Sequence, residues 1–136
     1  MIGGVIVSHG KLGEELINTA EMIVGKIFNI TSVSIDVTTD VETSREQIKQ
    51  AIQDVNNGAG VVIFTDMFGG TPSNISLSFL DEAHVEVVTG VNLAMLLQLS
   101  TSQKEEPFQE IVQSLKQRGQ ENIHIASEFL NQRGKK

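Results

Sequence analysis

Apolar positions along the chain follow two periods, one typical of buried strands and one typical of amphipathic helices. Residues 2–8 and 61–65 are continuous apolar runs, as expected for parallel strands covered on both faces. Residues 30–37 instead alternate between apolar and polar side chains, which predicts a strand at a sheet edge. Further strands are predicted at residues 84–89 and 122–126. Helical spacing predicts helices over residues 12–24, 44–56, 72–80, 93–99 and 107–118.

Residues at the ends of these segments support the helix assignments. Thr43 and Glu46 have the spacing of a capping box, and Asn92 is a suitable cap for the helix that follows it. Pro72 is expected at a first helical position, because its fixed φ suits that position and its missing N–H would have no partner there. Thr71 is then the expected cap of that helix. Gly119 is expected to stop the last predicted helix.

Strands that alternate with helices predict an α/β fold with an open, mostly parallel sheet and helices on both faces. The length of 136 residues is sufficient for one core. We therefore expect a single domain over residues 1–130 and a flexible basic tail over residues 131–136.

Composition narrows the classes of function. The net charge of −7 argues against nucleic acid or an anionic membrane as the main partner. The chain has no cysteine, which excludes disulfides, thiolate metal sites and thiol nucleophiles, and it has no long apolar run typical of a membrane span. We expect a cytoplasmic protein.

Two short motifs carry candidate chemistry. His9 ends the first predicted strand, and Asp66 ends the third, followed by Gly69, Gly70 and Thr71. In open parallel sheets the functional crevice lies beyond the carboxyl ends of the strands. If the first and third strands are neighbours, His9 and Asp66 meet there although 57 positions separate them in sequence.

This combination suits transfer of a phosphoryl group. A carboxylate that accepts a hydrogen bond from Nδ1–H of His9 leaves Nε2 as the nucleophile and stabilises the charge that develops on the ring. Asp66 must face the nitrogen opposite the phosphorus, because two like charges about 4 Å apart cost about 4 kcal/mol at an effective dielectric of 20. The glycine-rich turn can direct backbone N–H groups of Gly69, Gly70 and Thr71 toward a phosphate, and the Thr71 and Ser73 hydroxyls can add to them.

No nucleotide-binding motif is present, so we expect the donor to be a phosphohistidine of another protein and expect no nucleotide, metal or other cofactor. Met67 and Phe68 either pack in the core, or cover the site or face a docking protein. Plainer interpretations also remain open at this stage. His9 can be a surface residue, Asp66 an Asx turn, the two glycines a sharp turn, and Thr71 and Ser73 simple caps.

The segments Val-Ile-Val-Ser-His-Gly, ending at Gly10, and Thr-Asp-Met-Phe-Gly-Gly-Thr-Pro-Ser-Asn, ending at Asn74, resemble the IIA component of the mannose family of the bacterial sugar phosphotransferase system. The resemblance covers about residues 1–130. It implies strand order 2-1-3-4 with an antiparallel last strand, and a dimer formed through the C-terminal region. It also implies that His9 receives a phosphoryl group from the phosphocarrier protein HPr and passes it to a IIB subunit, with Asp66 as the partner of His9. The membrane is then involved only indirectly, through the IIC and IID components.

Other functions compatible with the sequence are a regulatory module that uses the same fold only to bind partners and a small metal-chelating or hydrolytic enzyme. The phosphotransfer subunit for dihydroxyacetone kinase has the same fold, but the second motif is more similar to the mannose family. The sequence does not identify the sugar. The chain stops at Lys136 without an Ala/Pro-rich linker, which favours a IIB component on a separate chain.

Overall fold

A computed structural model describes residues 1–101 and 105–134, and it confirms the predicted α/β fold. Four parallel strands form one sheet in the order β2-β1-β3-β4, the order that the resemblance implied. The strands are β1 (Gly3–His9), β2 (Ile30–Ile35), β3 (Val61–Thr65) and β4 (Val85–Thr89). The helices are α1 (Leu12–Val24), α2 (Val41–Val55), α3 (Thr71–Leu77), α4 (Leu93–Thr101), α5 (Phe108–Glu121) and α6 (Ala126–Gly134).

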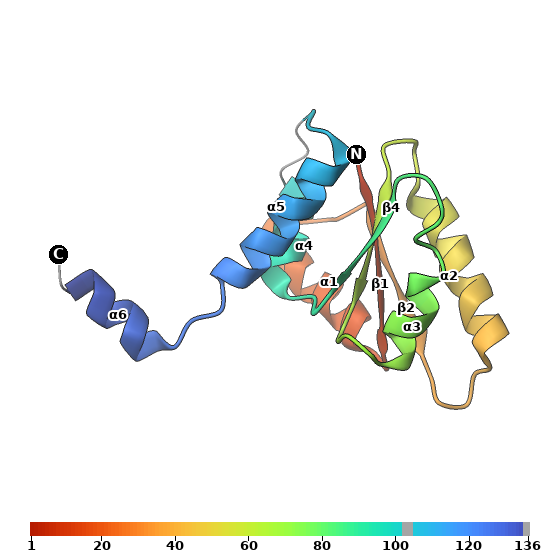
Figure 1. Ribbon diagram of the computed structural model, residues 1–136, viewed down its shortest axis with the longest axis horizontal. Helices are drawn as coiled ribbons and strands as arrows, with labels where there is room; N and C mark the ends of the chain where they lie inside the picture. Colours follow the sequence, from red (N-terminus) through yellow and green to blue (C-terminus); the bar gives the residue numbers. More distant parts are fainter. Residues whose placement is uncertain (102–104, 135–136) are drawn as a thin grey trace.

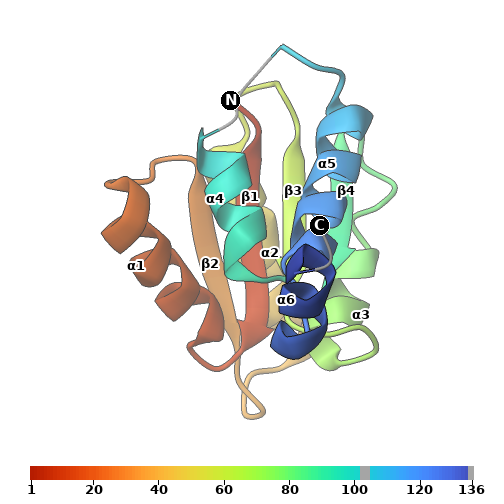
Figure 2. The same ribbon diagram turned by 90° about the vertical axis from the view of Figure 1, so that its left-hand side faces the viewer.

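The sheet is covered on both faces, as the continuous apolar strands predict. Helices α1, α4 and α5 lie on one face, and α2 and α3 lie on the other (Figures 1 and 2). Successive strand residues point to opposite faces, so β1 contributes Ile6 to the core under α1, α4 and α5, and Val5 and Val7 to the core under α2 and α3. None of the helices in residues 1–101 and 105–134 is both long and apolar enough to cross a bilayer.

The register brings the carboxyl ends of β1, β2 and β3 to one rim of the molecule. His9 pairs with Ile35 of β2, and Val7 pairs with Thr65, the last residue of β3. The loop that begins at Asp66 therefore starts directly beside His9. The loops that follow β2, β1 and β3 are neighbours on this rim.

Two helix starts differ from the predictions. Helix α2 begins at Val41, and its cap is Asp40, whose side chain accepts a hydrogen bond from the Thr43 backbone N–H at 2.7 Å. Thr43 therefore lies in the first turn, because the extended residue before the helix supplies the nearer acceptor. In α3 the cap position is Gly70, and Thr71 is the first helical residue, so Thr71 is not the cap. The position of Pro72 in the first turn is confirmed.

Two other helix ends test the sequence signals. Asn92 caps α4 as predicted, since its Oδ1 accepts the Met95 backbone N–H at 3.2 Å. Gly119 does not stop α5, which continues to Glu121. A Cβ on Gly119 would overlap the side chain of Met95, so this glycine permits the close approach of α5 to α4.

The C-terminal prediction was wrong in one respect. The expected antiparallel strand at residues 122–126 does not form, and α6 follows over residues 126–134, where the prediction placed the end of that strand and a tail. The segment leaves the body of the domain and carries α6 away from it (Figure 1). A strand needs a neighbouring strand to pair its backbone groups, and in the described part of the chain this segment pairs with no strand, since it does not run along the outer strand β4. Residues 126–130 include Ala, Glu and Leu, which favour helix. Residues 135–136 of the predicted tail lie outside the described part of the chain.

Candidate functional site

His9 and Asp66 meet at the carboxyl rim of the sheet, as the two motifs predicted. Nδ1 of His9 lies 2.6 Å from Oδ2 of Asp66, and the backbone N–H of His9 donates to the same oxygen at 2.9 Å. The other carboxylate oxygen, Oδ1, accepts the Met67 backbone N–H at 2.9 Å. The Asp66 side chain is therefore held at both oxygens. Its reading as a simple Asx turn accounts for none of the contacts with His9.

Neighbouring groups stabilise the ionised form of Asp66. Burial by itself raises the pKa of this carboxyl. This effect is outweighed by the backbone and ring hydrogen bonds from His9, by the proximity of the His9 charge and by the Met67 N–H. The pKa of Asp66 is therefore lowered below the ordinary value of 3.8. Asp66 is thus a carboxylate at neutral pH and accepts the proton on Nδ1. In the neutral imidazole the other ring nitrogen, Nε2, then carries a free lone pair.

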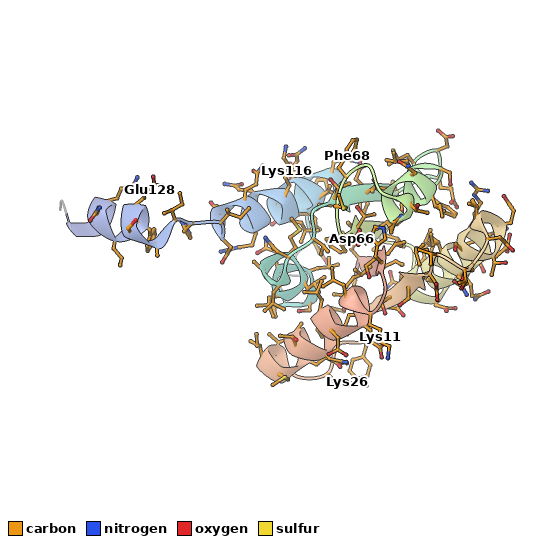
Figure 3. All side chains as sticks on the ribbon, turned by 90° about the horizontal axis from the view of Figure 1, so that it is seen from below. Lys11, Lys26, Asp66, Phe68, Lys116 and Glu128 are labelled. Carbon is orange, nitrogen blue, oxygen red and sulfur yellow. The ribbon has the colours of Figure 1, made fainter. Side chains whose placement is uncertain are left out.

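The two side chains differ in their access to solvent. Half of the His9 side-chain surface is exposed, compared with 10% for Asp66. Figure 3 views the molecule from the carboxyl ends of the strands and shows Asp66 near the centre of this rim, between Lys11 and Phe68. The carboxylate is therefore sheltered while the ring that it orients is open to an incoming molecule.

The two glycines of the β3–α3 loop have different roles. Gly69 has φ of +90°, in the region that favours glycine. Gly70 has φ of −87° and ψ of 174°, which any residue can adopt, but its backbone lies against the His9 ring. A Cβ on Gly70 would be 3.0 Å from Cε1 and 3.6 Å from Nε2 of His9. The missing side chain keeps space free beside Nε2 of His9.

The structure separates the two hydroxyl residues that were predicted to contact a phosphate. Thr71 is exposed at the start of α3. Ser73 is fully buried, and within the described part of the chain its hydroxyl has no hydrogen-bond partner. Neither residue is a side-chain cap of α3. Ser73 therefore does not present its hydroxyl to solvent at the rim.

Met67 and Phe68 do not pack in the core, so the first of the alternatives that the sequence left open is excluded. Phe68 is 73% exposed, and Met67 is also exposed. Two further apolar side chains are exposed: Leu12, at the start of α1, and Val37, on the loop after β2. The sequence pattern did not predict this exposure, because Leu12 fits the core positions of a helix and Val37 fits a strand pattern.

His9 and Asp66 lie on an open rim of the sheet, and a groove lies in another part of the molecule. A groove of about 520 Å³ runs along β4 and α5, and its lining includes Val87, Lys116 and Ile123. Among residues 1–101 and 105–134, no three His, Cys, Asp or Glu side chains are grouped as metal ligands would be. The half-exposed imidazole of His9 is accessible from solvent.

Comparison with known proteins identifies the family of this chain. The family model described as the PTS system fructose IIA component, EIIA-man, matches residues 3–116. The PTS system fructose-specific EIIA component of Bacillus subtilis is 29% identical over 131 residues, covering 96% of this chain and 90% of the relative. The PTS system mannose-specific EIIAB component of Escherichia coli K12 is 31% identical over 121 residues, covering 88% of this chain but 38% of that protein.

A solved structure extends the comparison to three dimensions. The mannose/sorbose specific IIA subunit of the phosphotransferase system from Enterococcus faecalis superimposes with a TM-score of 0.82 at 26% identity, covering 91% of this chain and 93% of the other. The family match includes both the His9 strand and the Asp66 loop. The chain therefore belongs to the EIIA-man family, the IIA components of the sugar phosphotransferase system.

Proposed function

We propose that this protein is a phosphoryl carrier in sugar uptake, in which His9 accepts a phosphoryl group from phosphorylated HPr and passes it to a IIB component. The observation that carries the proposal is the 2.6 Å contact between Nδ1 of His9 and Asp66, on a rim where the ring is half exposed. One relative is named as an EIIAB component, which supports a B component as the acceptor.

The chemical step needs little beyond positioning and charge. The lone pair on Nε2 forms a bond to phosphorus while the bond from phosphorus to the donor histidine breaks, and its electron pair returns to the donor ring. The ring of His9 becomes positive as it attacks, and Asp66 stabilises that charge through Nδ1–H. The group then leaves Nε2 for a nucleophile of the IIB component, and the electron pair of the P–N bond returns to the His9 ring.

The β3–α3 loop is the proposed support for the phosphate. Gly70 lies against Cε1 and Nε2 of His9, so its backbone is next to the position that the phosphoryl group would occupy. We assign phosphate contacts to the backbone of Gly69, Gly70 and Thr71 and to the exposed Thr71 hydroxyl. Ser73 was predicted with them, but its buried hydroxyl favours a packing role.

The partner proteins are proposed to dock over the apolar side chains that surround His9. Phe68 and Met67 lie on the loop after β3, and Val37 lies on the loop after β2. The strand order places these two loops on opposite sides of His9. Exposed apolar side chains on both sides of a reactive group are suited to a protein that must exclude water during transfer.

We also propose that the protein is a homodimer formed through its C-terminal segment. Ile123 and Ile125 are exposed on the segment between α5 and α6, and β4 is the outer strand of the sheet beside the groove described above. Residues 122–126 of a second copy can add to β4 as the antiparallel strand that does not form within one chain. The same contact would cover apolar side chains on both copies.

The first prediction concerns the phosphorylated residue. Incubation with phosphoenolpyruvate, enzyme I and HPr should place an acid-labile phosphate on the wild-type protein, and His9→Ala should abolish the label because the nucleophile is lost. His84→Ala and His124→Ala are the matched controls, because both histidines are exposed and distant in sequence, and both variants should be labelled. An unlabelled wild-type protein would refute the proposal. Label that reaches His9 but does not move to a IIB protein would favour the regulatory module.

The second prediction concerns Asp66. Asp66→Asn should lower the rate constant for phosphorylation of His9 by about 10²-fold or more, since an amide neither selects the Nδ1–H tautomer nor stabilises the imidazolium. Rapid-quench labelling measures the rate constant. Asp36→Asn is the control, because Asp36 follows β2 on the same rim and its side chain accepts the Thr38 N–H instead of a contact from His9. Equal rates for Asp66→Asn and wild type would contradict the assigned role.

The third prediction concerns the space beside Nε2. Gly70→Ala should keep the fold, because the backbone angles of Gly70 are open to alanine, but the new methyl group should crowd the ring and lower the rate of phosphorylation about tenfold or more. Asn74→Ala, at an exposed position in the helix that Gly70 precedes, should react at the wild-type rate. A Gly70→Ala variant with the wild-type rate would show that the phosphate lies elsewhere.

The fourth prediction concerns the dimer. Ile125→Asp should shift the protein to monomers in sedimentation equilibrium, because a charge would be buried in the proposed contact. Met22→Asp, which replaces an 85% exposed apolar residue on α1, should leave the association unchanged. Wild-type protein that sediments as a monomer at micromolar concentration, or dimers that persist in Ile125→Asp, would exclude this arrangement.

A further inference from the structure

The connection between His9 and α1 is short and tightly held. Only Gly10 and Lys11 separate the end of β1 from Leu12, the first residue of α1. Gly10 has φ of +54°, and its N–H donates to the backbone oxygen of Ile35 at 3.3 Å. The conformation of the His9 backbone therefore depends on the contacts that hold the two ends of this turn.

Ser8, on the strand side of this turn, forms a hydrogen bond across it. Its side chain is buried, and its hydroxyl oxygen accepts the backbone N–H of Gly13 at 2.9 Å. Gly13 is the second residue of α1, where a backbone N–H has no partner within the helix. The residue at the cap position, Lys11, offers no side-chain acceptor. Ser8 thus supplies the capping acceptor from the strand, five residues earlier in the chain.

The bond requires that α1 begin very close to the sheet. A Cβ on Gly13 would be 3.0 Å from Cγ2 of Ile6 and 3.2 Å from Cβ of Ser32. Gly13 therefore packs its backbone directly on β1 and β2. This close contact and the hydrogen bond to Ser8 together hold the first turn of α1 in a single position relative to β1.

Ser8 does not contact the reactive ring, because successive residues of a strand point to opposite faces. Its influence passes through the backbone of His9. The N–H of His9 and the ring Nδ1 both contact Oδ2 of Asp66, at 2.9 Å and 2.6 Å. A rotation of the His9 backbone would thus change two contacts with the same oxygen.

We propose that Ser8 is a positioning residue for phosphoryl transfer, which acts by holding the backbone of His9 so that N–H and Nδ1 reach one oxygen of Asp66 together. The inference rests on the proposed function only for its kinetic consequence. Its structural consequence, the orientation of the His9 ring, is independent of any phosphoryl donor.

The test compares Ser8→Ala, Ser8→Cys and Ser8→Thr with a matched control, Ser44→Ala. Ser44 is an equally buried serine in the first turns of α2. Alanine removes the acceptor, cysteine keeps a similar size with only a weak acceptor, and threonine retains the hydroxyl. The first measurement is the NMR signal of the His9 Nδ1–H proton and the ¹⁵N shifts of both ring nitrogens in the unphosphorylated protein. The second is phosphorylation of His9 by phosphorylated HPr as a function of donor concentration.

A positioning role predicts that Ser8→Ala and Ser8→Cys alter the Nδ1–H signal and lower kcat about tenfold with KM within about twofold of wild type. Ser8→Thr should restore both measurements, and Ser44→Ala should change neither. The proposal is overturned if Ser8→Ala or Ser8→Cys folds with the wild-type signal and kcat, or if a folded Ser8→Thr does not restore them. If wild-type His9 accepts no phosphate, the proposed function fails, and the NMR comparison still decides the role of Ser8.

Discussion

The contact between His9 and one carboxylate oxygen of Asp66 is the interaction on which the site depends. Oδ2 receives both the ring and the backbone of His9, and Oδ1 is held by the Met67 N–H. The same hydrogen bonds that lower the pKa of Asp66 select the proton position on the imidazole. This geometry exists because β1 and β3 are adjacent and parallel, so that residues 57 positions apart lie at the same rim.

The rim combines a firmly held carboxylate with an accessible imidazole. Asp66 is largely sheltered, while half of the His9 side chain remains accessible. On one side the backbone of Gly70 leaves space at Nε2, and on the other side Ser8 anchors the turn into α1 through Gly13. Exposed apolar residues such as Phe68 lie on the same rim, where we propose that a partner protein docks. Positioning of this kind supplies most of what phosphoryl transfer needs from a protein.

Much of the fold and the central pair could be predicted from the sequence, but several details could not. Continuous apolar strands and the positions of His9 and Asp66 at strand ends predicted their meeting, given the strand order that the family resemblance implied. The cap of α2 was misplaced because Asp40 lies closer to the helix start than the capping-box pattern indicated. Ser73 matched a phosphate-binding pattern, yet its side chain turns into the core. Such differences depend on which direction a side chain takes after a turn, and residue type does not specify that direction.

The amino-acid sequence by itself determined the alternation of strands and helices, the residue types at the site and the absence of cysteine chemistry, because these follow from local periodicity and composition. Only the tertiary structure decided which oxygen of Asp66 receives His9, how closely Gly70 and Gly13 approach their neighbours, and that Met67 and Phe68 face outward. It also decided that residues 122–126 are no strand within one chain. These properties depend on partners distant in sequence: a hydrogen bond, a close backbone contact or a strand ladder exists only when the second group has been brought into place.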